Sequence, residues 1–151
     1  KVVGLKPYTM PDALAAGSID AFAASEPTPS LGEMRGGRQL ATFGGMGNNF
    51  PIMMLATERC IDERNADMEK FMAALKEAER FLHSDKKAAA SIVAKAIGLP
   101  LAVTEKAMKR HTYHLGLDAA TLASLRETAA FLKNQGIITE VPELKTSINP
   151  R

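Results

Sequence analysis

The sequence predicts an α/β fold whose second half is rich in helices. Two observations carry this prediction. Residues 1 to about 58 contain many Gly and Pro residues between short apolar runs, which is typical of short strands and turns. Residues from about 65 to 135 are rich in Ala, Lys and Glu, and their apolar side chains recur at steps of three and four residues, which is typical of amphipathic helices. Strands mixed with helices define the α/β class.

The first half contains four segments that we expect to be strands and two that we expect to be short helices. The strand candidates are residues 2–5, 19–24, 39–43 and 50–57, and Pro51 favours an edge or first position in the last of them. The helix candidates are residues 11–16, stopped by Gly17, and 27–34, followed by a turn at Gly36 and Gly37.

The second half contains four expected helices. The first carries an apolar stripe over residues 68–82, with Asn65 or Asp67 as its cap. The second begins near Asp85 and ends at Gly98, with four residues facing inward: Ala89, Ile92, Val93 and Ala96. The third covers residues 101–111, the fourth runs from Asp118 to Gly136, and residues 137–151 are expected to be irregular.

Composition narrows the function. The chain has 151 residues, enough for one domain with a sizeable core. Its net charge of +2 is too small to indicate a nucleic-acid or membrane-surface partner. Cys60 is the only cysteine, so an intrachain disulfide and a cysteine-based metal cluster are excluded. His111 and His114 have a metal-like spacing but lack further ligands apart from Asp118, so we expect no metal site. Cys60 has no assignable base partner, which argues against a nucleophilic role, and we expect no cofactor and no catalysis.

Several stretches resemble one family of binding proteins. Residues 8–22, YTMPDALAAGSIDAF, are similar to a short helix of the form aaLaaGxiDA that leads into a strand, and Glu26-Pro27 follows it. Residues 71–78, 90–99 and 131–138 then occur in the matching order. Together they resemble the C-terminal portion of type II periplasmic solute-binding proteins of ABC importers, in the nitrate, sulfonate and taurine group, to which thiamine-precursor-binding proteins are related.

The resemblance implies two α/β lobes that hold a solute between them. Residues 1–43 would be the end of the second lobe and the crossover region, and residues 44–151 the mostly helical C-terminal part of the first lobe. Because a strand at the first residue needs a neighbour, we infer that residues are missing upstream. The implied protein is a monomeric receptor in the periplasm or outside the cell, and its partners are a small solute and an ABC permease. A membrane anchor at a missing N-terminus is left open.

The expected solute contacts follow the strand at 19–24. In open α/β sheets, ligands bind beyond the carboxyl ends of strands. Ser25, Glu26 and Pro27 lie there, and Thr28 begins a helix whose free amide groups would suit an anion. Asn48, in the Gly-rich turn at 44–49, offers a further donor. A plain strand-to-helix corner is the alternative interpretation. Many relatives have an aromatic residue where this chain has Ser25, so the solute itself stays open.

Two other functions remain as alternatives. Residues 92–110 resemble a helix-turn-helix, which would present four charged residues to DNA: Glu105, Lys106, Lys109 and Arg110. The weak net charge argues against a nucleic-acid partner. Enzymes of the same fold that synthesise the thiamine pyrimidine carry a cysteine cluster, which a chain with Cys60 alone lacks. A binding protein for a thiamine precursor needs only a pocket.

Overall fold

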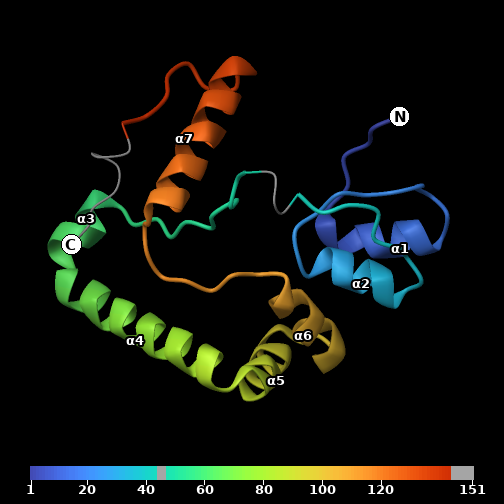
Figure 1. The fold of residues 1–151 in the computed structure, drawn as a ribbon, viewed down its shortest axis with the longest axis horizontal. Helices are drawn as coiled ribbons and strands as arrows, with labels where there is room; N and C mark the ends of the chain where they lie inside the picture. Colours follow the sequence, from blue (N-terminus) through green and yellow to red (C-terminus); the bar gives the residue numbers. More distant parts are fainter. Residues whose placement is uncertain (44–46, 144–151) are drawn as a thin grey trace. The chain divides into compact units, whose positions relative to one another are not determined.

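The computed structural model describes residues 1–43 and 47–143, and the regular structure in these ranges is entirely helical (Figure 1). A short 3-10 helix, η1 (Pro7–Thr9), leads into the first α-helix. Seven α-helices follow: α1 (Met10–Ala15), α2 (Thr28–Met34), α3 (Glu58–Glu63), α4 (Asn65–Ser84), α5 (Lys86–Ile97), α6 (Leu101–Lys109) and α7 (Ala119–Asn134).

The predicted α/β class is wrong, because the described residues contain no strand. Residues 2–5, 19–24, 39–43 and 50–57 are all irregular. An extended, apolar segment becomes a strand only when its backbone pairs with a neighbour, and β-propensity expresses packing more than a backbone preference. Without a sheet, apolar side chains of these segments stay exposed, as Val2 at 99%, Ile52 at 87% and Leu55 at 92% show. A type II binding-protein fold is therefore not what the described residues form.

The six predicted helices are confirmed as α1, α2 and α4 to α7, whereas α3 was not predicted. The ends of several of them follow from local chemistry. Asp85 caps α5 by accepting the Ala88 N–H at 2.9 Å, and Asp118 caps α7 by accepting the Thr121 N–H at 2.7 Å. Helices α1, α2 and α7 each end in a Schellman motif, in which two backbone hydrogen bonds close the last turn around a glycine with positive φ. The three glycines are Gly17, Gly36 and Gly136. Residues 137–143 are irregular as expected, and residues 144–151 lie outside the described ranges.

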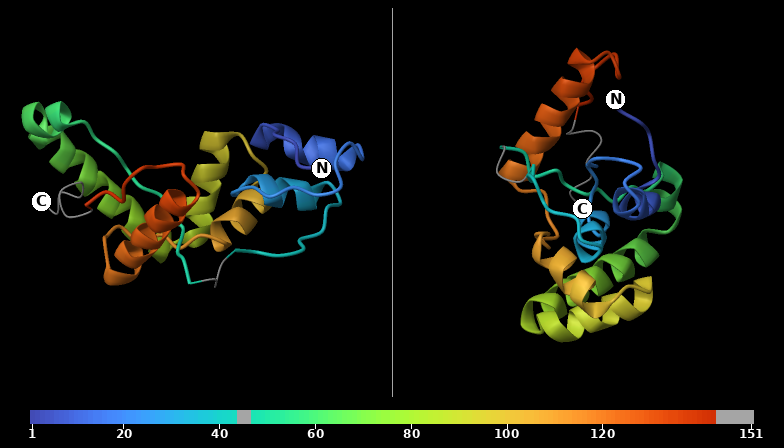
Figure 2. Two further views of the ribbon diagram at one scale, coloured as in Figure 1. Left: turned by 90° about the horizontal axis from the view of Figure 1, so that it is seen from above. Right: turned by 90° about the vertical axis from the view of Figure 1, so that its right-hand side faces the viewer.

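The chain divides into two compact units. The first contains residues 1–41 and 70–114, and the second contains residues 42–69 and 115–151. In the first unit α1 packs on α2, α2 on α6, and α6 on α5 (Figure 2). An ion pair between Asp12 and Arg35 also joins α1 to the end of α2. The predicted lobe boundaries, 1–43 and 44–151, concern a larger architecture and stay predictions.

Small residues form the core of the first unit. The buried positions of its three central helices are Thr28, Ser30 and Gly32 in α2, Ala89, Ala90 and Ala94 in α5, and Val103, Thr104 and Ala107 in α6. Only Ala89 of the four residues expected to face inward in α5 is buried, and Ile92 is 60% exposed. The alanines of α5 are therefore the residues that this helix buries most fully, while its larger apolar side chains are half-buried or exposed.

The second unit is organised around α7. Ser124 and Ala129 are the buried residues of this helix. Residues 48–49 run along it and form hydrogen bonds with it. Helix α3 packs at the start of α4, where the Cys60 Sγ lies 3.8 Å from the Met68 Sδ.

Candidate functional site

The predicted solute-binding segment leads into α2 in the first unit. Ser25 is exposed, whereas Thr28 is only 6% exposed and the Glu26 side chain 9%. Pro27 is the N-cap residue of α2, and the Glu26–Pro27 peptide is cis. Ser25 is therefore the residue of this segment that is most open to solvent, and the side chains of Glu26 and Thr28 lie inside the fold.

The amide groups at the start of α2 are already used. The Thr28 N–H donates to the Ser25 carbonyl at 3.2 Å, and the Ser30 N–H donates to Glu26 Oε2 at 3.2 Å. Pro29 has no N–H to offer. The free-amide argument for an anion site therefore does not hold in the described structure, because the Glu26 carboxylate already occupies the place of the anion. Contact between solute and Ser25, Glu26, Pro27 or Thr28 stays a prediction.

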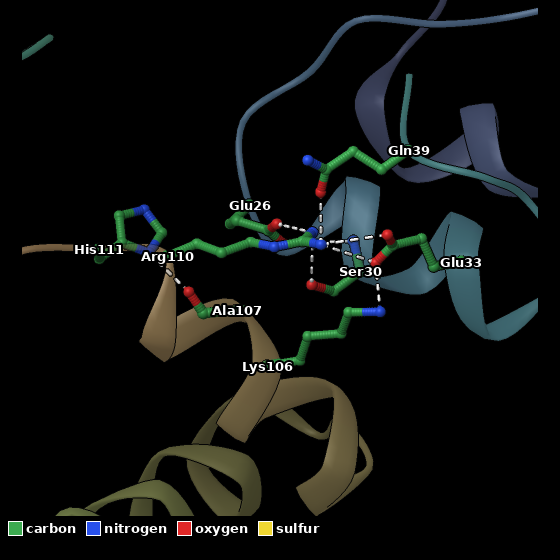
Figure 3. A network of polar contacts seen from close by, with 8 residues as sticks. All are labelled: Glu26, Ser30, Glu33, Gln39, Lys106, Ala107, Arg110 and His111. Atoms are coloured by element: carbon green, nitrogen blue, oxygen red, sulfur yellow. Dashed lines mark hydrogen bonds and ion pairs between the residues drawn. The ribbon is translucent and has the colours of Figure 1, made fainter. Parts of the chain in front are cut away.

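Arg110, just after α6, is the centre of a polar network that fixes this segment. Figure 3 shows acceptors from α2 and its flanking loops gathered around the guanidinium group. Nη1 donates to Glu26 Oε1 at 2.7 Å and lies 3.4 Å from Ser30 Oγ. Nη2 donates to both oxygens of Glu33, at 3.1 and 2.9 Å, and to Gln39 Oε1 at 2.7 Å. One side chain thus ties α6 to both ends of α2.

The network is electrically balanced, since two carboxylates face two cations. Lys106 Nζ lies 2.5 Å from Glu33 Oε2 and is the second cation. The hydrogen bond from Lys106, together with those from Arg110 and the charges of both, lowers the pKa of Glu33, although burial opposes the shift. Hydrogen bonds to Glu26 and then to Glu33 raise the pKa of Arg110. A balanced cluster of this kind, whose carboxylates are mostly buried and whose cations are partly exposed, is a positioning device, because each of its charges is already paired.

Sequence reasoning missed this network, although its signal is present. Glu26, Ser30 and Glu33 are spaced by four and three residues, and Lys106 and Arg110 by four, so each set shares one face of its helical segment. The helix-turn-helix interpretation predicted that Lys106 and Arg110 face DNA. In the structure these two side chains contact the carboxylates of the first unit.

A shallow cavity of about 120 Å³ lies beside the network, in the same unit. Its apolar wall is formed by Pro27, Val93, Ile97, Ala107 and Met108. Four residues with polar groups complete the lining: Glu26, Thr104, His111 and Tyr113. Two of the predicted site residues, Glu26 and Pro27, therefore border a cavity, and the helix pair α5–α6 supplies most of the remaining wall.

Asn48 belongs to the second unit, where it bonds to α7. Its Nδ2 donates to the Ser124 carbonyl at 3.1 Å, to Glu127 Oε2 at 3.0 Å and to Thr128 Oγ1 at 3.2 Å. Its Oδ1 accepts the Phe50 N–H at 2.8 Å. Residues 44–46 of the predicted Gly-rich turn lie outside the described ranges. A role for Asn48 in solute binding stays a prediction, and its hydrogen bonds show a structural role.

Replacing Asn48 by alanine is expected to destabilise the second unit. The change removes the side-chain hydrogen bonds to α7, and each such bond contributes about 0.5–1.5 kcal/mol, so we expect a loss of about 1–2 kcal/mol. Urea unfolding followed by circular dichroism measures this loss. Asn65→Ala is the matched control, because that amide bonds only within its own exposed helix turn, to Glu69 Oε1 at 3.1 Å. Equal losses in the two variants would contradict the structural role of Asn48.

Acid is expected to weaken the first unit through Glu33. Its folded-state pKa lies below the ordinary value of 4.5. The unfolded chain therefore binds its proton first, and the stabilisation, complete above about pH 4.5, is lost as the pH falls through the lowered pKa. Unfolding midpoints between pH 7 and 3 should fall less steeply in Glu33→Gln than in the wild type. Glu63→Gln is the control, because Glu63 pairs with Arg59 at the surface and its side chain is 64% exposed, so the pH dependence of its midpoint should match that of the wild type. The same pH dependence in Glu33→Gln as in the wild type would exclude Glu33 as the cause.

The described ranges hold no cluster of three His, Cys, Asp or Glu side chains suited to a metal ion. In the same ranges no single helix has the length and apolar character needed to cross a bilayer. The pair α5 and α6 meets that test jointly, but the chain turns by 117° between them.

Comparison with known proteins gives the class of this chain. The NMT1-like family matches residues 1–98, which include the Ser25–Thr28 segment and the whole of α1 to α5. No curated protein and no solved structure matches the chain. The chain belongs to the NMT1-like family, and this membership indicates a solute-binding protein of the ABC-importer type.

Proposed function

We propose that this chain is part of the extracytoplasmic receptor of an ABC importer, and that it binds a small anion of the nitrate, sulfonate or taurine kind without catalysing a reaction. The observation that carries the receptor assignment is the family match over residues 1–98. The anion class rests on the resemblance of residues 8–22 and Glu26-Pro27 to that group. The permease in the membrane is the proposed partner, and the periplasm or cell exterior is the proposed location.

Within this proposal, Ser25 is the residue best placed to touch the solute. It is exposed, and the residue after it is held by Arg110 through a 2.7 Å hydrogen bond. An exposed hydroxyl on a chain segment whose neighbouring residues are fixed suits recognition, because little backbone order has to be gained on binding. Glu26 and Thr28 then act as supports for the position of Ser25.

The test is a thermal-shift assay of the whole protein as its gene encodes it. The panel contains taurine, alkanesulfonates, nitrate, bicarbonate and thiamine precursors. A ligand present at about 100 times its dissociation constant stabilises the folded state by about 2.7 kcal/mol, which gives a clear rise in melting temperature. A rise with one class supports the receptor and names its solute. A flat response to the whole panel would contradict the proposal.

Calorimetric titration of variants then locates the site. Ser25→Ala and Thr28→Ala should both weaken binding of the solute found. Ser18→Ala is the control, because Ser18 is also exposed and lies in the turn after α1. Unchanged affinity in both site variants would move the solute contacts to another part of the protein.

One geometric observation favours a second candidate function. Helices α5 and α6 are separated by residues 98–100, and the chain turns by 117° between them, within the range for a helix-turn-helix. Lys106 and Arg110 are engaged with Glu33 and Glu26, however, which lowers their availability to phosphate groups. A gel shift with duplex DNA at low and high salt tests this candidate, and absence of a salt-sensitive complex excludes it.

A further inference from the structure

The shallow cavity beside the Arg110 network is open to solvent on one side and bounded by buried residues of α6 on the other. Ile97 at its edge is 52% exposed, and His111 is also exposed. Thr104 and Ala107 in α6 are only 2% and 7% exposed and form the floor. Small residues on α6 therefore create the space, and side chains of α5 and of the segment after α6 surround it.

Glu26, Thr104 and the Nδ1 atom of His111, which border the cavity, already have hydrogen-bond partners. The Glu26 oxygens accept from Arg110 Nη1 at 2.7 Å and from the Ser30 N–H at 3.2 Å. Thr104 Oγ1 donates to the Pro100 carbonyl at 3.2 Å, and His111 Nδ1 bonds the Ala107 carbonyl at 3.1 Å. Burial raises the pKa of Tyr113, so its hydroxyl stays neutral. A charged ligand would gain no free counter-charge here.

The volume suits one small group. A cavity of about 120 Å³ is larger than a single water needs, and it is poor in free polar partners that would hold water. An enclosed apolar engineered cavity of roughly 150 Å³ takes benzene or xenon. The cavity here is shallow and open to solvent, so it would cover only one side of such a group. The apolar wall of this cavity would shield the ring or alkyl end of a ligand from solvent, which is the favourable term for such a contact.

The geometry points to a second small-molecule site in the first unit, between α5, α6 and the Glu26-Pro27 corner, that takes a neutral apolar ring or short alkyl group. This inference goes beyond the receptor proposal, because it requires neither an anionic solute nor closure of two lobes. The two ideas also fail separately, since the anion panel can be silent while the apolar site is occupied, and the reverse.

Titration of the whole protein with benzene tests the site, with methyl groups labelled with carbon-13 and observed by NMR. Saturable shifts are expected at the methyls of Val93, Ile97, Ala107 and Met108, while Ile92, on α5 but outside the lining, should not move. Benzylammonium is the charged comparison, chosen because it is not an anion of the proposed solute class, and it should not produce these shifts. Non-saturating or uniformly spread shifts with benzene would overturn the proposal, as would stronger shifts with benzylammonium.

A pair of variants adds an independent measurement. Ile97→Glu places a charge at the mouth and should weaken benzene binding at least about tenfold, because the carboxylate would lose hydration against the ligand. Ile92→Glu is the matched control, since Ile92 is 60% exposed, Ile97 is 52% exposed, and both lie in α5. The affinity of Ile92→Glu for benzene should stay within about twofold of that of the wild type. Equal affinities in the two variants would place the benzene elsewhere.

Discussion

Arg110→Ala is expected to lower the free energy of unfolding of the first unit by about 2–3 kcal/mol at neutral pH. This is less than the roughly 3–5 kcal/mol lost when a fully buried ion pair is broken, because Arg110 is partly exposed. The Arg110 side chain is 29% exposed, whereas those of Glu26 and Glu33 are 9% and 16% exposed. Truncation would leave two nearly buried carboxylates close together, and only Glu33 would keep a cation, Lys106. Removing one partner therefore costs more than the pair contributes by itself.

Urea unfolding and amide hydrogen exchange measure this effect. The amides of α2 and α6 should lose protection in Arg110→Ala, while those of α7, in the second unit, should keep it. Lys109→Ala is the control, since Lys109 is an exposed neighbour of like charge. Arg110→Lys should recover part of the loss, because an ammonium keeps the charge but lacks the fork that reaches several acceptors. A change below about 0.5 kcal/mol in Arg110→Ala would show that the network does not hold the unit together.

Gly37→Ala is expected to destabilise the first unit by about 1–3 kcal/mol, the usual cost of overpacking. A Cβ atom at Gly37 would lie 2.8 Å from the Gly32 carbonyl oxygen and 3.1 Å from Leu14 Cδ2. The Gly37 N–H donates to that same carbonyl at 2.9 Å and closes the end of α2. The clash is with backbone, so relief requires the end of α2 to move.

Gly4→Ala is the matched control for this change. Nothing lies within 4 Å of a Cβ built at Gly4, so the variant should be neutral or slightly more stable. The melting temperatures of the two variants and the wild type provide the comparison. A Gly37→Ala protein as stable as Gly4→Ala would mean that the close approach between Gly37 and Gly32 contributes nothing to the fold.

The candidate site was only partly visible in the sequence. The corner at Glu26-Pro27 is readable, because an acidic residue before a proline marks a chain turn and the resemblance names it. The partner of Glu26 is not readable, because Arg110 lies 84 positions further along the chain. The cavity is hidden for the same reason, since its lining comes from α5, α6 and two loops that no local pattern connects.

The sequence by itself determined six of the helices, α1, α2 and α4 to α7, and where several of them begin or end, but it did not indicate α3. Asp85 and Asp118 start helices, and Gly17, Gly98 and Gly136 end them, because caps and left-handed turns depend on neighbouring residues alone. Whether residues 2–5 or 50–57 become strands was decided by tertiary structure, because a strand exists only through a partner that local sequence does not specify. The face that α5 buries was decided in the same way, since packing within the first unit buries Ala89, Ala90 and Ala94 and leaves Ile92 and Ile97 more than half exposed.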